Sequence, residues 1–490
     1  MSLSFDPASV DLPEGHFIGG EYIPGLGQLP LRRPSDGAVL ADLPVGDVAT
    51  VDRAVAAAQQ ALRSSGWGGA HPRDRTRALL RWADLIETDA VDLARLEAVA
   101  STRAIGQLID GDIAVTAEQI RFFAEMTDKE GGDLVPTRDG ALGMVVTEPH
   151  GVVGAITPWN FPISMAGWKI APALAAGNAV VIKPSEMTPF STLRMAELAV
   201  RAGIPAGLVN VVLGDGPVTG TALTGHPDIA KISFTGSTRA GQAIMANVAG
   251  TGMKPMTLEL GGKSPQLVFA DADLDLAADC IARSITFNAG QACVAGTRVL
   301  ADAAIADALA EALVRRMQVT PGVTWDERTE YAPIISETQT ARIERIVGAA
   351  VAQGAEVLTG GDRFDFPGTF YRPTLLAGVG VGSPAVLEEI FGPVLTLQTF
   401  ASEEEAIELA AHPIYGLCAG IFTRDLSRAL RVMRRIEAGT IWINRYGRSR
   451  DHILPTGGYK SSGIGKDLGR DAYHANRRTK SVLIDIEGTP

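Results

Sequence analysis

Residues 151–184 read GVVGAITPWNFPISMAGWKIAPALAAGNAVVIKP. The stretch begins with a continuous apolar run, continues with apolar residues at helical spacing, and ends with a second apolar run. Two more apolar runs, VNVVLG and KISFTG, follow further along the chain, with helical segments between them. Continuous apolar strands that alternate with helices are typical of a parallel sheet covered on both faces. We therefore predict an α/β fold that binds its ligands where the strands end.

The flanking regions extend this organisation in both directions. Hairpins are predicted within the Gly- and Pro-rich residues 17–46, and helices over 48–63 and 72–98. Residues 131–150 predict an extended ribbon that turns at Asp139-Gly140. Beyond about residue 262 a second α/β domain is predicted, with helices near 274–290, 303–317 and 337–353 and strands near 355–359, 394–400 and 419–423.

The segment KSVLIDI, at 480–486, is predicted to be a strand without an obvious neighbour in sequence. A solitary exposed strand is an aggregation hazard. We therefore expect it to join another sheet, and a subunit boundary is one place where it could do so.

Composition limits the partners and the compartment. The chain has 490 residues, enough for roughly two to four domains. Its formal net charge of -12 and the lack of a sustained basic run argue against binding of nucleic acid. No apolar run is long enough for a membrane helix and the first 16 residues do not resemble a signal peptide. Three cysteines make a poor disulfide framework, so we expect a cytoplasmic protein.

Three strand ends carry residues suited to a dinucleotide. The turn at 214–220 has the spacing GxGxxxG, one residue longer than the usual fingerprint, so a ligand-free glycine turn explains it equally well. Lys183 and Glu186 could bind the two hydroxyls of an adenosine ribose, and Glu186 would repel a 2′-phosphate, which favours NAD over NADP. A solvated ion pair is the alternative. Ser233-Phe234-Thr235-Gly236-Ser237 leads into a helix whose free amides could hold a pyrophosphate.

Three other residues suit chemistry at an aldehyde carbon. Cys293, in FNAGQACVAG, supplies a thiol, and Asn160, in a proline-bracketed turn, supplies an amide donor. Glu259 lies between two leucines, where desolvation should raise its pKa and suit it to be a general base. Each has a simpler explanation: a buried inert thiol, a loop-holding amide and a turn cap. Cys280 and Cys418 are interpreted as structural.

Seven blocks, TPWNFP, VIKPSE, FTGS, LELGGKSP, FNAGQAC, EEIFGPV and GGYKSSGIGKD, resemble the signature blocks of the NAD(P)-dependent aldehyde dehydrogenase superfamily in order and separation. The resemblance runs from about residue 15 to 487. It implies a Rossmann-like cofactor domain (1–129 and 150–261), an α/β catalytic domain (262–474) and a β-arm for oligomerisation (130–149 and 475–490). A homodimer or homotetramer and a small aldehyde substrate would follow, and no metal is expected.

The resemblance also implies roles for individual residues. Cys293 would be the nucleophile, Asn160 and the Cys293 amide the oxyanion hole, and Glu259 the base that activates water. Lys169 would relay protons with the carboxylate of Asp467, less directly than a longer glutamate. The positions that match cofactor contacts are Thr157, Trp159, Lys183, Glu186, Gly216, Gly220, Gly236, Ser237, Glu389 and Phe391. The positions that match the substrate tunnel are Phe161, Met165, Trp168 and Phe287.

Two further expectations concern the substrate. Gly290, Ala292 and Ala295 are small, and we expect them to leave room for an aldehyde and a nicotinamide to approach the sulfur from opposite sides. One hypothesis makes Arg445, Arg448 and Arg450 a carboxylate-binding mouth for a semialdehyde acid; arginines that serve subunit contacts or a solvated surface are the alternative.

Three other functions compete with aldehyde oxidation. A CoA-acylating dehydrogenase would not need Glu259 to activate water. A thiol hydrolase would need a histidine partner for Cys293, and none of the seven histidines lies in a recognisable Cys–His signature. A non-catalytic protein of the same fold would have no need to keep Cys293, Glu259 and Asn160 together.

Overall fold

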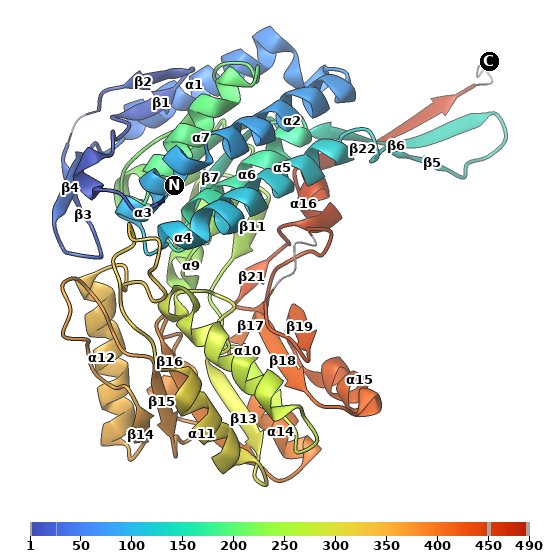
Figure 1. Ribbon diagram of the computed structural model, residues 1–490. Helices are drawn as coiled ribbons and strands as arrows, with labels where there is room; N and C mark the ends of the chain where they lie inside the picture. The colour runs from blue at the N-terminus through green and yellow to red at the C-terminus, as the bar shows by residue number, and fades with distance from the viewer. Residues whose placement is uncertain (1, 26, 448–451, 487–490) are drawn as a thin grey trace.

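The computed structural model describes residues 2–25, 27–447 and 452–486. Two large sheets form its two halves, and a small three-stranded sheet projects from the first half (Figure 1). The prediction of an α/β fold is confirmed.

The first sheet has eight strands in the order β2-β1-β9-β8-β7-β10-β11-β21. Its five central strands are parallel, and β1, β2 and β21 are antiparallel to their neighbours. The residues run β2 Glu21–Ile23, β1 His16–Ile18, β9 Val209–Val211, β8 Ala179–Lys183, β7 Val152–Ile156, β10 Lys231–Thr235, β11 Met256–Glu259 and β21 Gly463–Ile464. β8 and β9 are added on one side of β7, and β10 and β11 on the other. The carboxyl ends of β7 and β10 therefore form the switch point where open α/β sheets bind ligands.

Helices cover both faces of this sheet, and its central strands β7, β8 and β10 are buried at every residue. They are α1 Val48–Ser65, α2 Pro72–Thr88, α3 Ala90–Ala100, α4 Ile105–Gln107, α5 Ala114–Met126, α6 Pro162–Ala175, α7 Phe190–Arg201, α8 Thr221–Gly225 and α9 Thr238–Thr251. The helical prediction over 72–98 is confirmed as two helices, because α2 ends at Thr88 and Asp89 is the N-cap of α3. Asp89 also accepts two hydrogen bonds from Arg194 of α7, at 2.7 Å each, which fix the break.

The second sheet has seven strands, all parallel except β14, in the order β14-β15-β16-β13-β12-β18-β19. They are β14 Glu356–Thr359, β15 Thr374–Ala377, β16 Val394–Phe400, β13 Arg298–Asp302, β12 Pro265–Val268, β18 Cys418–Phe422 and β19 Thr440–Ile443. The helices of this half are α10 Leu274–Thr286, α11 Ala306–Arg316, α12 Glu337–Ala352, α13 Pro384–Leu387, α14 Glu403–Ala410 and α15 Leu426–Arg435. Its core is separate from that of the first half.

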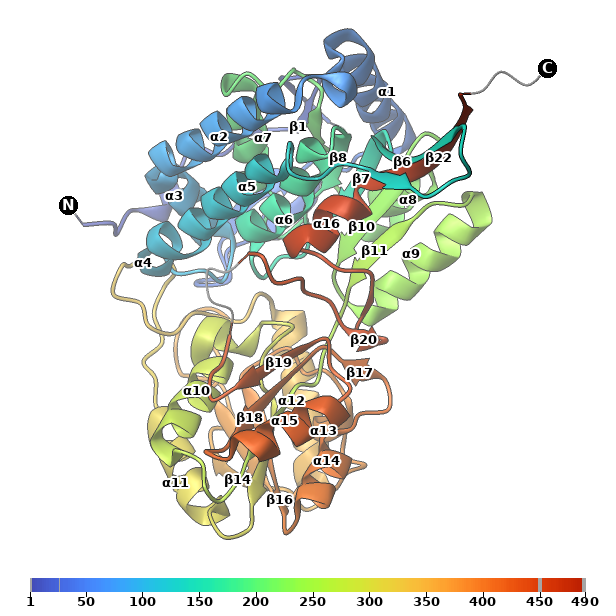
Figure 2. The same ribbon diagram turned by 90° about the vertical axis from the view of Figure 1, so that its right-hand side faces the viewer.

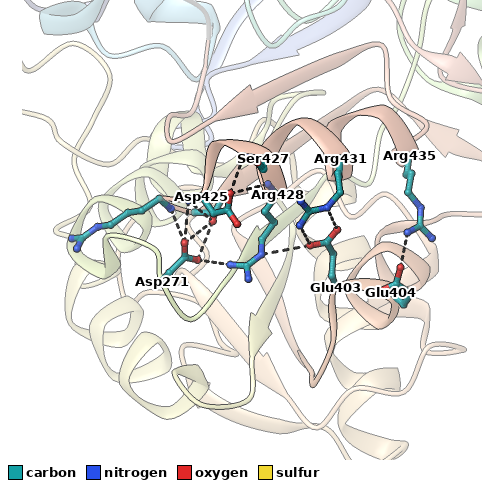
Figure 3. Close-up of polar contacts among 10 residues, drawn as sticks. Asp271, Glu403, Glu404, Asp425, Ser427, Arg428, Arg431 and Arg435 are labelled. Carbon is teal, nitrogen blue, oxygen red and sulfur yellow. Dashed lines mark hydrogen bonds and ion pairs between the residues drawn. The ribbon is translucent and has the colours of Figure 1, made fainter.

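Ion pairs hold α15 to its neighbours at the surface of the second half (Figure 3). Arg431 and Arg435 pair with Glu403 and Glu404 of α14, each at 2.9 Å or less. Arg428 reaches Asp271 after β12 at 2.7 Å. Such exposed pairs are each worth about 0–1 kcal/mol, so we assign them to orientation of the helix rather than to global stability.

The projecting sheet contains β5 Asp133–Val135, β6 Ala141–Pro149 and β22 Arg477–Asp485. The predicted ribbon with a turn near Gly140 is confirmed, because β5 and β6 pair as a hairpin. β22 pairs with β6 along all nine residues, so the carboxyl-terminal strand finds a partner within its own chain.

The chain returns to the first half near its end. β21 adds to the edge of β11, and α16 (Gly469–Ala475) packs against α6 (Figure 2). The predicted domain boundaries stay predictions, but residues 463–475 lie against the first sheet.

Candidate active site

A cavity of about 180 Å³ lies at the switch point of the first sheet, against the second half of the molecule. Residues at or after the ends of β7, β10 and β11 form one side of it, and residues of α12 and of the segments after α10 and α13 form the other. The cavity is lined by Pro158, Trp159, Asn160, Phe161, Met165, Thr235, Gly236, Ser237, Leu260, Gly261, Cys293, Gln339, Arg342, Glu389 and Phe391. The predicted nucleophile and several predicted cofactor residues therefore share one cavity.

Cys293 reaches the cavity through an irregular segment. Helix α10 ends at Thr286, and Asn288 and Ala289 then adopt a left-handed conformation with φ of 49° each. Cys293 itself is half-buried and packs with Val294 against Leu417, Cys418 and Trp442. The turn thus carries the thiol out of the helix toward the first half.

The small residues beside Cys293 have a role in packing. Gly290 has φ of 70°, and a Cβ there would lie 2.3 Å from the Gly392 carbonyl oxygen. Ala292 and Ala295 are buried in the core of the second half. These contacts show that the three residues permit close packing of backbone and core; that they also leave room for ligands stays a prediction.

Asn160 is fixed by a buried hydrogen-bond network. Its Nδ2 donates to the Gln291 carbonyl at 3.0 Å, which uses one of the two N–H donors of the amide. The backbone carbonyl of Asn160 accepts from Asn288 Nδ2 at 3.0 Å, and Asn288 Oδ1 accepts from Thr102 Oγ1 at 2.6 Å. The Gln291 side chain in turn accepts from the Ile335 amide at 2.8 Å. Asn288 and Gln291 therefore position the candidate oxyanion donor relative to the Cys293 segment.

Glu259 ends β11 and is buried, but it does not line the cavity. Its Oε1 lies close to Gly457, where a Cβ would come within 2.7 Å of it. The carboxylate therefore faces the 457–466 segment. To reach Cys293 it would have to turn about its side-chain torsions.

Lys169 and Asp467 form a buried ion pair at 2.5 Å, with side-chain exposures of 0% and 6%. The shorter carboxylate still contacts Lys169 directly, because β21 and the turn after it bring Asp467 onto α6; the proton relay itself stays a prediction. A second buried lysine, Lys231, donates to Thr257 Oγ1 at 2.7 Å, and burial lowers the pKa of Lys231 to about 8.

The predicted adenosine-ribose residues lie side by side. Lys183 Nζ donates to the carbonyls of Pro184 and Gly214 at 2.8 Å each and to Glu186 Oε2 at 3.4 Å. Burial lowers the pKa of Lys183. Gly216 and Gly220 bound the short π-helix that begins after this point, and a Cβ on Gly216 would meet no atom within 4 Å.

The other predicted cofactor residues belong to the cavity itself. Ser237 caps α9, with its side chain accepting from the Ala240 amide at 3.2 Å, and Gly236 precedes it. Glu389 Oε1 accepts from the Gly262 amide at 2.9 Å, and burial raises the pKa of Glu389 to about 7. Trp159 meets Phe391 edge to face, with centroids 5.2 Å apart.

Two buried hydroxyls bear on whether a dinucleotide fits the cavity. Across residues 2–25, 27–447 and 452–486, the Oγ1 atoms of Thr157 and Thr235 are buried and have no hydrogen-bond partner. Thr235 lines the cavity, and Thr157 directly follows the neighbouring strand β7. Buried polar groups normally have partners. A polar ligand along these strand ends fits both the orphaned hydroxyls and the α9 N-terminus beside them.

Two of the four predicted tunnel residues, Phe161 and Met165, line the cavity. Phe287 stacks on Phe161, with centroids 5.9 Å apart, and so lies behind it. Trp168 is half-buried on α6, away from the lining. Gln339 and Arg342, from α12, also line the cavity and were not predicted, because a helix more than forty residues beyond Cys293 carries no local motif that points to it.

The predicted carboxylate-binding mouth is only partly described. Arg445 is exposed, and its Nη2 donates to the Gly447 carbonyl at 3.2 Å. Arg448 and Arg450 lie outside the described residues. In the described part of the chain, no group of three or more His, Cys, Asp or Glu side chains is arranged to hold a metal ion.

Comparison with known proteins identifies the family. Residues 24–482 match the model of the aldehyde dehydrogenase family. An indole-3-acetaldehyde dehydrogenase of P. syringae, solved with NAD+, is 38% identical, with a TM-score of 0.95 and 98% of each chain covered. A gamma-glutamyl-gamma-aminobutyraldehyde dehydrogenase of Burkholderia cenocepacia is 40% identical, with the same TM-score and coverage. The NAD+ complex of Staphylococcus aureus betaine aldehyde dehydrogenase is 35% identical, with a TM-score of 0.94 over 98% of this chain and 96% of that one.

This chain belongs to the aldehyde dehydrogenase family. Among its described helices, none is long and apolar enough to span a bilayer.

Proposed function

We propose that this protein oxidises a small aldehyde to the carboxylate with NAD, through a thioester on Cys293. The observation that carries the proposal is the shared cavity: Cys293 and Asn160 line it together with Ser237 and Glu389. A nucleophile, an amide donor and residues suited to a dinucleotide are thus within reach of one small ligand.

Cys293 would attack the aldehyde carbon and form a thiohemiacetal. Asn160, whose amide keeps one N–H after its bond to Gln291, would donate to the oxygen that becomes negative. Thr235, Gly236, Ser237 and Glu389 would hold the cofactor, with Trp159 and Phe391 beside its reactive end. The chemistry that NAD supplies when bound is acceptance of a hydride, which leaves a thioester on Cys293.

Glu259 would then turn from Gly457 toward the cavity and take a proton from the water that hydrolyses the thioester. The buried pair of Lys169 and Asp467 would carry that proton onward. This use of water favours a hydrolytic enzyme over a CoA-acylating one. A thiol hydrolase is disfavoured because, among the described residues, no histidine lines the cavity.

An NADH-absorbance screen over a panel of aldehydes tests the proposal, with wild type beside Cys293→Ser. Cys280→Ser is the matched control, because Cys280 is also a half-buried free thiol but lies on α10 outside the cavity. We expect Cys293→Ser to lose essentially all activity and Cys280→Ser to keep it. Absence of NADH formation by wild type with every aldehyde would refute the proposal.

We also propose NAD rather than NADP as the preferred cofactor. Glu186, 3.4 Å from Lys183, would repel a 2′-phosphate. Glu186→Ser should lower the ratio of kcat/KM for NAD to that for NADP at least tenfold. An unchanged ratio would remove Glu186 from the argument.

The projecting sheet is proposed to join subunits into a homodimer or homotetramer. β22 is its edge strand and exposes Leu483 and Ile484, and β5 exposes Leu134. Light scattering of the full chain should give an oligomer, and Leu483→Lys should shift it toward monomer. A monomeric wild type would exclude this role.

A further inference from the structure

A buried ion pair lies behind the predicted substrate tunnel. Arg103 follows α3 and is 1% exposed, and Asp112 lies on the short π-helix Leu108–Ile113. Arg103 Nε donates to Asp112 Oδ2 at 2.7 Å and Nη2 donates to Oδ1 at 3.2 Å. This two-pronged contact fixes the plane of the guanidinium.

The same guanidinium faces both aromatic rings of the tunnel. Arg103 Cζ is 4.9 Å from the centroid of Phe161 and 4.6 Å from that of Phe287. The two rings are nearly parallel, with an interplanar angle of 19°. Because Phe161 lines the cavity, the guanidinium holds the wall that a substrate chain would touch.

The charges behind this wall are already balanced. The Asp112 carboxylate occupies the fork of Arg103, and only Nη1 lacks a hydrogen-bond partner among the described residues. The neighbouring Glu97 accepts from the Ile163 amide at 3.2 Å, and burial raises the pKa of Glu97 to about 8, so it is mostly protonated at neutral pH. A substrate carboxylate placed against Phe161 would therefore lose its hydration and meet no net positive charge from the groups behind that ring.

We propose that the Arg103–Asp112 pair is a specificity-determining element of the tunnel. Arg103 holds Phe161 and Phe287 in place against the apolar chain of an uncharged aldehyde. Asp112 cancels the charge of Arg103, so that aldehydes bearing a carboxylate are rejected. This inference rests on the proposed function, since it concerns the substrate of that site.

The first test compares hexanal with 6-oxohexanoate, which has the same chain length and a terminal carboxylate. Wild type should prefer hexanal in kcat/KM by at least 100-fold. Asp112→Asn uncovers the Arg103 charge and should reduce that preference at least tenfold, through a lower KM for 6-oxohexanoate. Asp110→Asn, an exposed carboxylate two residues earlier on the same π-helix, is the matched control and should change nothing.

The second test removes both charges with Arg103→Met/Asp112→Leu, which leaves no buried ion unpaired and should fold. The rings then lose the group that holds them. KM for hexanal should rise at least fivefold, whereas kcat/KM for acetaldehyde, which has only one methyl group to pack on the rings, should stay within twofold. KM for NAD should be unchanged.

Each outcome decides the question. Equal use of hexanal and 6-oxohexanoate by wild type overturns the inference without any variant. If Asp112→Asn does not fold, an unchanged hexanal KM in the double variant overturns it instead. If wild type oxidises no aldehyde, the proposed function is refuted. If wild type is active but the variants keep its selectivity, only this inference is refuted.

Discussion

The pair of Lys169 and Asp467 should show what burial does to an ion pair in this protein. Asp467→Asn leaves the Lys169 ammonium, whose side chain is 0% exposed, beside a neutral amide. Removing one partner of a buried pair costs about 3–5 kcal/mol, because the remaining charge is uncompensated. Lys231, also buried near this pair, adds a second cation, so we expect a loss near the upper end of that range.

Urea-induced unfolding at pH 7, followed by tryptophan fluorescence, measures the loss. Glu437→Gln is the matched control because Lys460 and Glu437 are 2.6 Å apart, almost the same distance, with side chains 28% and 62% exposed. An exposed pair is worth about 0–1 kcal/mol. Lys169→Met/Asp467→Leu should recover most of the stability, since it removes both charges together.

Two results would refute this reasoning. One is a loss below about 1 kcal/mol for Asp467→Asn, the upper value for an exposed pair. The other is a double variant no more stable than Asp467→Asn, which would mean that packing of the side chains, and not their charge, accounts for the loss.

Three further predictions concern single residues. Glu259→Gln should keep a pre-steady-state burst of NADH but slow the steady-state rate by about 10²-fold or more, because only thioester hydrolysis loses its base. Stopped-flow absorbance measures both phases, and loss of the burst would contradict this role. Burial raises the pKa of Glu389 to about 7, so its carboxyl is increasingly protonated as pH falls from 8 to 6, and KM for NAD should rise over that range. In Glu389→Gln, KM for NAD should not change with pH, and a KM that still rises would assign the pH dependence to another group. Burial lowers the pKa of His16 to about 4, so the unfolded chain binds a proton that the folded chain excludes, and stability should fall as pH drops from about 6.5 toward 4. Thermal melts at pH 7 and pH 5 should show a smaller decrease in Tm for His16→Gln than for wild type. An equal decrease would show that His16 is not responsible.

The alternation of strands and helices after residue 151 was sufficient to predict the α/β fold and the edge where ligands bind. Asn160 and Ser237 came into one cavity because strand ends and the turns after them are fixed by the first sheet, whose sequence pattern is local. The break at Asp89 within the helical region 72–98 could not be predicted, because Asp89 is held by Arg194, a contact between segments far apart in sequence.

What lay beyond prediction depends on the approach of distant segments. The direction of the Glu259 carboxylate is set beside Gly457, and the need for glycine at 290 is set by the Gly392 carbonyl. Gln339 and Arg342 enter the cavity from α12. No periodicity or local motif contains such information, since it exists only once the two halves have packed together.

The return of β21 and α16 to the first half has a consequence for biosynthesis. A ribosome delivers the chain from its amino terminus, so β11 is complete about two hundred residues before β21 can cover its edge. During that interval the β11 edge is unpaired and Lys169 lacks Asp467. A nascent chain halted before residue 463 would therefore expose an unfinished sheet edge, which is the kind of surface that chaperones hold and that proteases recognise.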